Sequence, residues 1–264
     1  MNRRRDPRTV VLAVLTGAFL TLAALAILPI AIATLCQARR LYARYARQVA
    51  RVILRIWSLR VDVHGRPQPG PRQVVYISNH SSTIDLFVLV ALGLPNTRFF
   101  LSGFLQKIVP LGILAHLMGT FFTVPQDQHE QRRRIFARAC RTLARTGESV
   151  YLSPEGGRIT TGEIGRFNKG AFHLATALGA PLAPFYIFIP REIDPGVGYR
   201  ARPGTVVVTF KPLIDTHEWH VVDVVANTER VRDLFVAWHR EAWQERHDPR
   251  TDSAPAGQVV HARA

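Results

Sequence analysis

The chain of 264 residues is short of cysteine, lysine and acidic residues. Its two cysteines, Cys36 and Cys140, are too few for a disulfide framework or a cysteine-rich zinc module. Only three of the 34 basic residues are lysine, so the formal net charge of +15 comes almost entirely from arginine. An apolar fraction of 47% with 20% charged residues excludes an intrinsically disordered chain.

The positive charge is concentrated in the first 60 residues. That segment contains 11 arginines and a single acid, Asp6, whereas residues 61–264 contain 23 basic and 18 acidic residues. A nucleic-acid-binding domain would carry its positive excess on the globular body, so we predict no nucleic-acid partner.

Several common catalytic motifs are missing. The sequence has no G-x-S-x-G nucleophile elbow, no G-x-x-x-x-G-K-[ST] phosphate loop and no G-x-G-x-x-G dinucleotide fingerprint. The one close histidine pair, His217 and His220, does not belong to a recognisable set of zinc ligands. We interpret it as a surface feature and predict no metal site and no bound cofactor.

Residues 10–36 form an uncharged, apolar run of 27 residues. As a helix it would be about 40 Å long, which exceeds the roughly 30 Å hydrocarbon core, so it can span a bilayer with tilt. A secretory signal peptide would have a shorter apolar region, of about 7–15 residues. We predict a membrane helix here, and Pro29 leaves open a re-entrant insertion.

Five arginines recur every three or four residues directly after this run. On a helix they share one narrow face, with Tyr45, Val49 and Ile53 on the other. We predict a basic amphipathic helix over residues 38–57 that lies along the membrane with its arginines among lipid phosphates. The alternative is an ordinary amphipathic helix packed on the core. Residues 1–60 are thus predicted to attach the chain to a membrane. The five arginines are Arg40, Arg44, Arg47, Arg51 and Arg55.

Short apolar runs alternate with helical patterns beyond residue 60, which predicts an α/β domain over residues 61–246. Residues 64–71 are a turn-rich connector, and residues 247–264 are predicted to be a polar tail. The predicted strands are 74–78, 98–101, 121–124, 150–152, 182–189 and 205–210, and the predicted helices are 84–92, 104–118, 131–145, 169–178 and 221–245.

The candidate catalytic pair is His80 and Asp85, in the sequence N-H-S-S-T-I-D that follows the apolar run 74–78. A histidine five residues before an aspartate arises easily by chance, and we interpret His247 and Asp252 as such an accident. The first pair, however, lies at a strand-to-helix junction, where α/β proteins place active sites.

His80 and Asp85 can meet only if the histidine sits in the loop before the first helical turn. Five positions along one helix would separate the two side chains by about 140°. In the loop arrangement Asp85 would hold one imidazole nitrogen and leave the other as a base. The alternative is a pair that merely stabilises the turn.

A second constellation, S-P-E-G-G-R, ends the predicted strand 150–152. Gly156 and Gly157 permit close approach to the backbone, and Arg158 offers two parallel donors for a phosphate. Taken alone, the pattern is also that of an ordinary turn with a solvated ion pair.

Together these blocks resemble the lysophospholipid acyltransferase family, typified by 1-acyl-glycerol-3-phosphate acyltransferase. Residues 79–85 match its N-H-x-S-x-x-D block, and residues 154–158 match P-E-G-T-R with Gly157 in place of threonine. Residues 119–124 resemble the start of its acceptor block, which here ends in Pro125 and Gln126 instead of Asp-Arg. Residues 167–171 resemble F-K-x-G-A, and 180–184 resemble its V-P-[IV]-x-P block.

The resemblance implies a glycerolipid acyltransferase-like fold, a mixed sheet flanked by helices. It implies transfer of a fatty acyl group from acyl-CoA or acyl carrier protein to a lysophospholipid, most directly 1-acyl-glycerol-3-phosphate. His80 would be the general base and Asp85 its partner, without a metal. The implied substrate-binding residues are Glu155, which orders its loop, and Gly156, Gly157, Arg158 and Lys169.

Three alternatives stay open at this point. The acceptor could be a lysolipid without phosphate, such as a lyso-ornithine lipid, or the chain could be an inactive membrane protein that binds lipid. A metal-dependent hydrolase would need further ligands beside His80 and Asp85. Seven arginines lie at residues 37–60 against four before residue 10. This bias predicts an inner-membrane protein whose catalytic domain faces the cytoplasm.

Overall fold

The computed structural model describes residues 7–65, 73–194 and 201–247. Its centre is a seven-stranded sheet with strand order β1-β7-β6-β2-β5-β3-β4. Neighbouring strands are parallel except for β6 and β7, which are antiparallel, so the sheet is mixed as the resemblance implied. The strands are β1 (Leu59–His64), β2 (Val75–Ser78), β3 (Thr97–Ser102), β4 (Phe121–Thr123), β5 (Ser149–Tyr151), β6 (Leu182–Phe188) and β7 (Gly204–Phe210).

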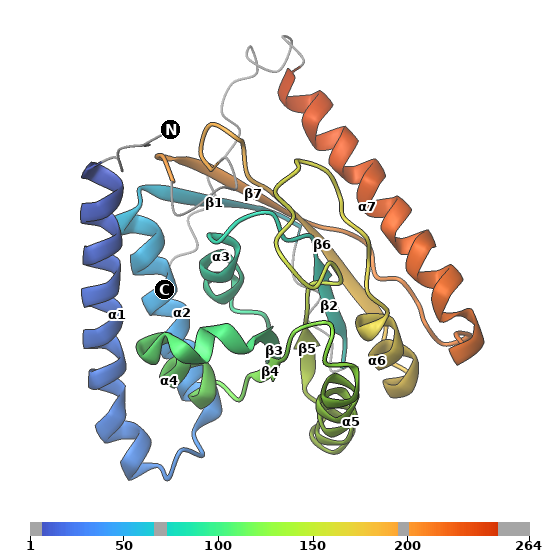
Figure 1. The fold of residues 1–264 in the computed structure, drawn as a ribbon, viewed down its shortest axis with the longest axis horizontal. Coiled ribbons are helices and arrows are strands. Elements are labelled where there is room, and N and C mark those ends of the chain that lie inside the picture. The colour runs from blue at the N-terminus through green and yellow to red at the C-terminus, as the bar shows by residue number, and fades with distance from the viewer. Residues whose placement is uncertain (1–6, 66–72, 195–200, 248–264) are drawn as a thin grey trace.

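Helices cover both faces of this sheet (Figure 1). One face carries α1 (Pro7–Ala33), α2 (Arg39–Ile56), α3 (Asp85–Leu92) and α4 (Val109–Leu117), and the other carries α5 (His129–Thr146), α6 (Gly170–Leu178) and α7 (Val224–His247). Short 3-10 helices, η1 (Gly103–Lys107) and η2 (Val221–Asp223), precede α4 and α7.

The central strands are apolar because both of their faces are buried. Alternate side chains of a strand point to opposite faces of the sheet. In β2, Tyr76 joins the core beneath α2 and α3, whereas Val75 and Ile77 join the core beneath α5, α6 and α7. This double burial is what makes β2, β5 and β6 recognisable as short apolar runs in the sequence.

Helix α1 is the one described helix that is long and apolar enough to cross a bilayer. It lies alongside α2 in an antiparallel hairpin (Figure 1) and buries Leu20 and Ile27 in a cluster shared with α2 and α4. Val14, Leu22 and Ile32 are at least 64% exposed. The helix therefore presents an uncovered apolar surface, which supports membrane association.

Helix α2 occupies residues 39–56, close to the predicted 38–57, and packs as part of the main domain. Its Ala50 and Leu54 lie in the same core cluster as Val88 of α3. At its start, Arg39 pairs with the buried Glu148, which also pairs with Arg98 of β3. The apolar side of α2 is therefore covered by side chains of the main domain.

The arginine stripe of α2 is only partly directed to solvent. Arg40, Arg44 and Arg55 are exposed, but Arg47 Nε donates a hydrogen bond to the carbonyl of Ala91, 3.2 Å away at the end of α3. A cation at a helix C-terminus satisfies a carbonyl that has no partner within the helix. Arg47 thus packs against the end of α3, and contact of the arginines with lipid stays a prediction.

Strand β1 has no counterpart among the predicted strands. It pairs in parallel with β7, from Leu59 opposite Gly204 to His64 opposite Thr209. β1 is an edge strand. Only its Leu59 is buried, Val61 is partly buried, and its other side chains are exposed to solvent. Residues 66–71 of the predicted connector and residues 248–264 of the predicted tail lie outside the described residues.

Candidate active site

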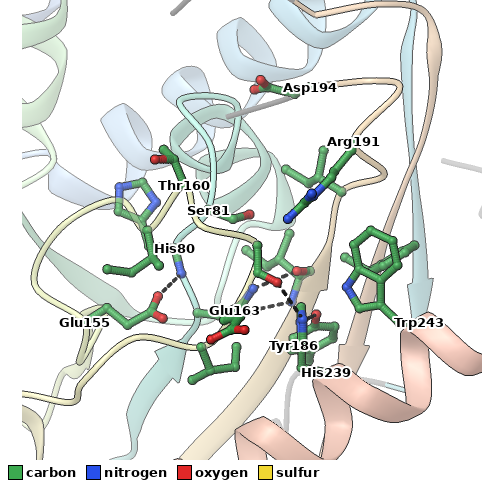
Figure 2. Close-up of a pocket in the computed structure, with 17 residues that line it drawn as sticks. His80, Ser81, Glu155, Thr160, Glu163, Tyr186, Arg191, Asp194, His239 and Trp243 are labelled. Atoms are coloured by element: carbon green, nitrogen blue, oxygen red, sulfur yellow. Dashed lines mark hydrogen bonds between the residues drawn. The ribbon is translucent and has the colours of Figure 1, made fainter. Parts of the chain in front are cut away.

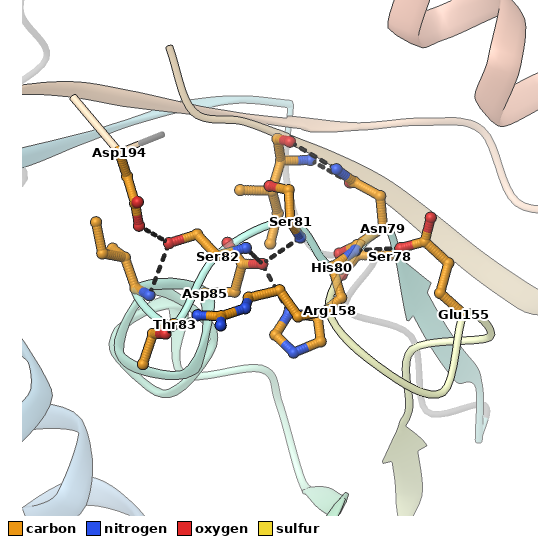
Figure 3. Close-up of polar contacts among 12 residues, drawn as sticks. Ser78, Asn79, His80, Ser81, Ser82, Thr83, Asp85, Glu155, Arg158 and Asp194 are labelled. Atoms are coloured by element: carbon orange, nitrogen blue, oxygen red, sulfur yellow. Dashed lines mark hydrogen bonds and ion pairs between the residues drawn. The ribbon is translucent and has the colours of Figure 1, made fainter. Parts of the chain in front are cut away.

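Three loops meet at the carboxyl ends of β2, β5 and β6. They are residues 79–84, residues 152–169 and residues 189–194, and hydrogen bonds join each of the last two to the first (Figure 3). In a sheet whose strands run parallel, the carboxyl edge is where loops from separate strands converge on one site. The sequence candidates His80, Asp85 and Arg158 all lie here.

His80 and Asp85 are in direct contact. His80 Nδ1 lies 2.8 Å from Asp85 Oδ2, with the histidine in the loop and the aspartate as the first residue of α3. This is the loop placement that the spacing required. The Asp85 side chain is 1% exposed and that of His80 31% exposed, so the aspartate is enclosed while the imidazole reaches the surface of the site.

Asp85 Oδ2 accepts two further hydrogen bonds, from the backbone amides of Ser81 at 2.8 Å and Ser82 at 3.0 Å. Both amides are donors only, so the group they face is an acceptor oxygen. The imidazole must then carry its proton on Nδ1 to donate to the same oxygen. This assignment leaves Nε2 of His80 with a lone pair, as a general base requires.

The backbone of His80 is fixed by the loop that follows β5. The amide of His80 donates to Glu155 Oε2 at 2.6 Å, and the carbonyl of His80 accepts from the amide of Ile159 at 2.8 Å. On the preceding residue, the Asn79 side chain exchanges two 2.8 Å hydrogen bonds with the backbone of Ile187, extending the pairing of β2 with β6. The position of His80 is therefore set by three strands.

Glu155 is buried and ties two segments together. Its Oε1 accepts from the amide of Gly165 at 2.8 Å, while Oε2 accepts from His80. Burial raises the pKa of Glu155 to about 7, against the opposing effect of these two amide donors. Both carboxylate oxygens are occupied by backbone, so Glu155 orders the loop, and the structure does not place it against a substrate directly.

The glycine pair is asymmetric. Gly156 has φ +68°, and a Cβ there would lie 2.5 Å from the Asn168 amide nitrogen and 3.0 Å from that of Gln126. A side chain at Gly156 would be strained and would also displace Asn168, which holds the loop through the carbonyls of Pro154 and Glu155. No atom of the described residues lies within 4 Å of a Cβ built at Gly157.

Arg158 is exposed and reaches across from the loop to the catalytic turn, where its guanidinium donates to the Thr83 hydroxyl (Figure 3). This contact keeps a cation within the turn that joins His80 to Asp85. Lys169 is also exposed, at the start of α6, but no hydrogen bond or ion pair among the described residues brings its side chain to this turn. The structure thus gathers Arg158 with the pair and leaves Lys169 apart.

Asp194 is a site residue that no sequence motif singled out, and it contacts Ser82, the serine of the N-H-x-S-x-x-D block. The Ser82 hydroxyl donates to Asp194 and accepts from the amide of Ile84 at 3.0 Å, at the start of α3. Both side chains are buried. Asp194 lies 112 residues from Ser82, so only the tertiary structure could reveal this contact.

An apolar cleft, partly open to solvent, lies beside the first turn of α3. Its lining includes Leu86 and Phe87, which follow Asp85 on α3, together with Leu20 of α1 and Leu105 of η1. Its lining is apolar except for Thr120, so it suits a hydrocarbon chain. The cleft connects the helices that carry the exposed apolar surface with the residues next to His80 and Asp85.

The chain is similar to known acyltransferases. A model of the acyltransferase family matches residues 60–188. The chain is 29% identical over 185 residues to a chloroplastic 1-acyl-sn-glycerol-3-phosphate acyltransferase of Brassica napus, which covers 66% of this chain and 53% of that protein. It is 27% identical over 194 residues to the 1-acyl-sn-glycerol-3-phosphate acyltransferase of Saccharomyces cerevisiae, covering 72% and 63%.

The fold is also that of a solved structure. The 1-acyl-sn-glycerophosphate acyltransferase PlsC of Thermotoga maritima superposes with a TM-score of 0.64 over 86% of this chain and 95% of that one, at 18% identity. The fold and the site therefore define an acyltransferase domain. More narrowly, the chain belongs to the lysophospholipid acyltransferase family. It spans about half the length of the Brassica relative that it matches.

Proposed function

We propose that the protein transfers a fatty acyl group from a thioester donor, acyl-CoA or acyl carrier protein, to the free hydroxyl of 1-acyl-glycerol-3-phosphate. The product would be phosphatidic acid. The observation that carries the proposal is the 2.8 Å contact of His80 Nδ1 with the enclosed Asp85, which leaves Nε2 as a base on the exposed side. The names of the sequence relatives support this acceptor.

The reaction needs no covalent acyl-enzyme. Nε2 of His80 removes the proton from the acceptor hydroxyl as its oxygen attacks the thioester carbonyl. The carbon–oxygen bond forms, the carbon–sulfur bond breaks, and the departing thiolate takes the proton back from the imidazolium. Asp85 stabilises that imidazolium and keeps the ring in the orientation that presents Nε2.

Arg158 is the group that would bind the acceptor phosphate. It is exposed beside the catalytic turn, and a guanidinium can grip a phosphate through two parallel hydrogen bonds. The Thr83 hydroxyl at its side can donate to the same phosphate. Glu155 and Gly156 would hold the loop in the shape that places Arg158 there.

Gln126, which lies near Gly156, favours a second class of acceptor, one without a phosphate. Gln126 stands where the family usually has a basic residue, and its amide nitrogen would lie 3.0 Å from a Cβ at Gly156. No described contact brings the Lys169 side chain to the catalytic turn, so Arg158 is the one cation that the described contacts place there. A lysolipid without a phosphate is therefore the alternative acceptor.

The experiment is an acyl-transfer assay with purified full-length protein, a panel of lysolipids and both thioester donors, with products identified by mass. Arg158→Ala should reduce kcat/KM on 1-acyl-glycerol-3-phosphate by about tenfold or more, the loss of a charge-assisted hydrogen bond or two. Activity on an uncharged monoacylglycerol should stay unchanged. An equal loss on both acceptors would show that Arg158 is structural.

We also propose that the protein lies at the inner membrane with its catalytic domain in the cytoplasm, where both thioester donors are made. The exposed apolar surface of α1 supports the attachment, and the arginine bias around that helix supports the orientation. Protease added to sealed inverted vesicles should cut residues 61–264. Protection of that region would refute the orientation.

A further inference from the structure

A second pocket opens from His80 in a direction that the proposed reaction has not used. It is partly open to solvent and runs from His80 and Thr160 past Tyr186 to Arg191 and Trp243 (Figure 2). Its lining does not include Arg158 or the residues of the apolar cleft. It is therefore a separate approach to the same histidine.

The pocket continues into an open groove along α7. The two share Gly162, Glu163, Arg191, His239 and Trp243. The groove adds Arg232 and Arg240 from α7. Three arginines face one glutamate along this surface, so the groove favours an anionic ligand.

Two of these arginines have donors to offer. Arg191 gives one hydrogen bond, from Nη2 to the carbonyl of Thr161 at 2.9 Å, and its guanidinium lies 5.8 Å from the centre of the Trp243 ring. A guanidinium has five N–H donors, so most of those of Arg191 remain for a ligand. Arg240 is exposed on α7. Arg232 is committed instead to the carbonyls of Gly165 and Ile164.

One side of the pocket carries a fixed polar pair, His239 and Tyr186. His239 Nε2 lies 3.1 Å from the carbonyl of Gly162, and its Nδ1 lies 2.6 Å from the Tyr186 hydroxyl. A carbonyl can only accept, so Nε2 donates to it, and in the neutral imidazole Nδ1 accepts from the tyrosine hydroxyl. Burial also lowers the pKa of His239. Such a polar side suits an uncharged polar chain better than a hydrocarbon.

We propose that this groove binds the phosphate-bearing pantetheine arm of the thioester donor, with its phosphate at Arg191 and Arg240. The inference rests on the proposed function. The thioester carbon must lie at His80, the acyl chain suits the apolar cleft, and Arg158 is assigned to the acceptor. The arm is a polar chain with two amides that ends in a phosphate. The pocket joining His80 to the free arginines matches that order of groups.

The test varies donor and protein together. Wild type, Arg191→Gln, Arg240→Gln and the double variant are assayed with acyl-CoA, acyl carrier protein and an S-acyl pantetheine that has no phosphate. The double variant should lose about tenfold or more in kcat/KM with a phosphate-bearing donor, as expected for charge-assisted hydrogen bonds. It should stay within about twofold of wild type with acyl pantetheine, because no phosphate is present to lose its partner.

The matched control is Arg134→Gln, which removes the same charge from an exposed position on α5. It should leave all three donors unaffected. A loss shared by acyl-CoA and acyl carrier protein assigns the groove to the phosphate of the arm, and a loss confined to acyl-CoA assigns it to the nucleotide phosphates next to that arm. An equal loss with acyl pantetheine, or no loss with any donor, overturns the inference. Wild-type protein inactive with every donor would instead refute the proposed function.

Discussion

The Asp85→Asn variant tests the catalytic pair more sharply than removal of the histidine. Asparagine has nearly the same shape as aspartate but carries no charge. Oδ2 of Asp85 faces the amides of Ser81 and Ser82 as well as His80. An asparagine NH₂ at that position would meet two backbone donors, so its oxygen must take the place of Oδ2 and its nitrogen that of Oδ1.

The expected loss follows from this orientation. The asparagine oxygen still accepts from His80 Nδ1, so Nε2 stays unprotonated and the ring keeps its orientation. What disappears is the negative charge beside the imidazolium. Charge-assisted hydrogen bonds exceed neutral ones by about 1–3 kcal/mol, so we expect kcat/KM to fall by about 10- to 100-fold. A forced change of tautomer would cost about 10⁴-fold, as in serine-protease triads.

A loss of stability should accompany the loss of rate. Asp85 Oδ1 is buried and has no hydrogen-bond partner among the described residues. In the variant an unpaired NH₂ replaces this already unpaired oxygen, so the loss comes from the bonds of the Ser81 and Ser82 amides, which change from charge-assisted to neutral and together cost about 1–3 kcal/mol of unfolding free energy. The assay is acyl transfer with a thermal unfolding curve in the same detergent, and Asp62→Asn on the exposed side of β1 is the control. A rate loss below threefold, or one near 10⁴-fold, would refute the orientation argument.

Three further predictions concern the residues around this pair. His80→Ala should reduce transfer by about 10²–10⁴-fold and leave the fold intact by circular dichroism, since it removes the general base; activity within a few-fold of wild type would refute the assignment. The pKa of Glu155 is raised to about 7 in the folded protein. Between about pH 4.5 and 7 the folded state therefore keeps this carboxyl protonated, whereas the unfolded chain has lost the proton. Wild type should therefore lose up to about 3 kcal/mol of stability relative to Glu155→Gln as the pH rises from about 4.5 to 7, a trend that paired thermal unfolding curves would detect and a constant difference would contradict. Asp194→Ala should lower kcat by about tenfold with little change in KM, because the Ser82 hydroxyl loses its buried acceptor. Asp194→Asn keeps an acceptor oxygen and should retain most of the rate. A rise in KM alone would contradict this positioning role.

The sequence could predict the features of this protein that depend on neighbouring residues. The apolar run that forms α1, the stripe that forms α2 and the doubly buried strands β2 and β6 all follow from local periodicity. The contact of His80 with Asp85 was also predictable, because a loop of five residues constrains where both side chains can lie. The resemblance to a known family extended this to Arg158 and Glu155, whose blocks lie about 75 residues further along the chain.

Contacts between distant segments were decided only by the tertiary structure. The antiparallel pairing of β6 with β7 and the edge position of β1 depend on which strands become neighbours, which local propensity does not determine. The bonds of Glu155 to His80 and of Asp194 to Ser82 join loops from separate strands. The hydrogen bond from Arg47 to the carbonyl of Ala91 likewise joins two helices that lie far apart in the sequence. A free carbonyl or carboxylate buried at a loop junction must find its partner nearby in space, and spacing along the chain carries no information about that partner.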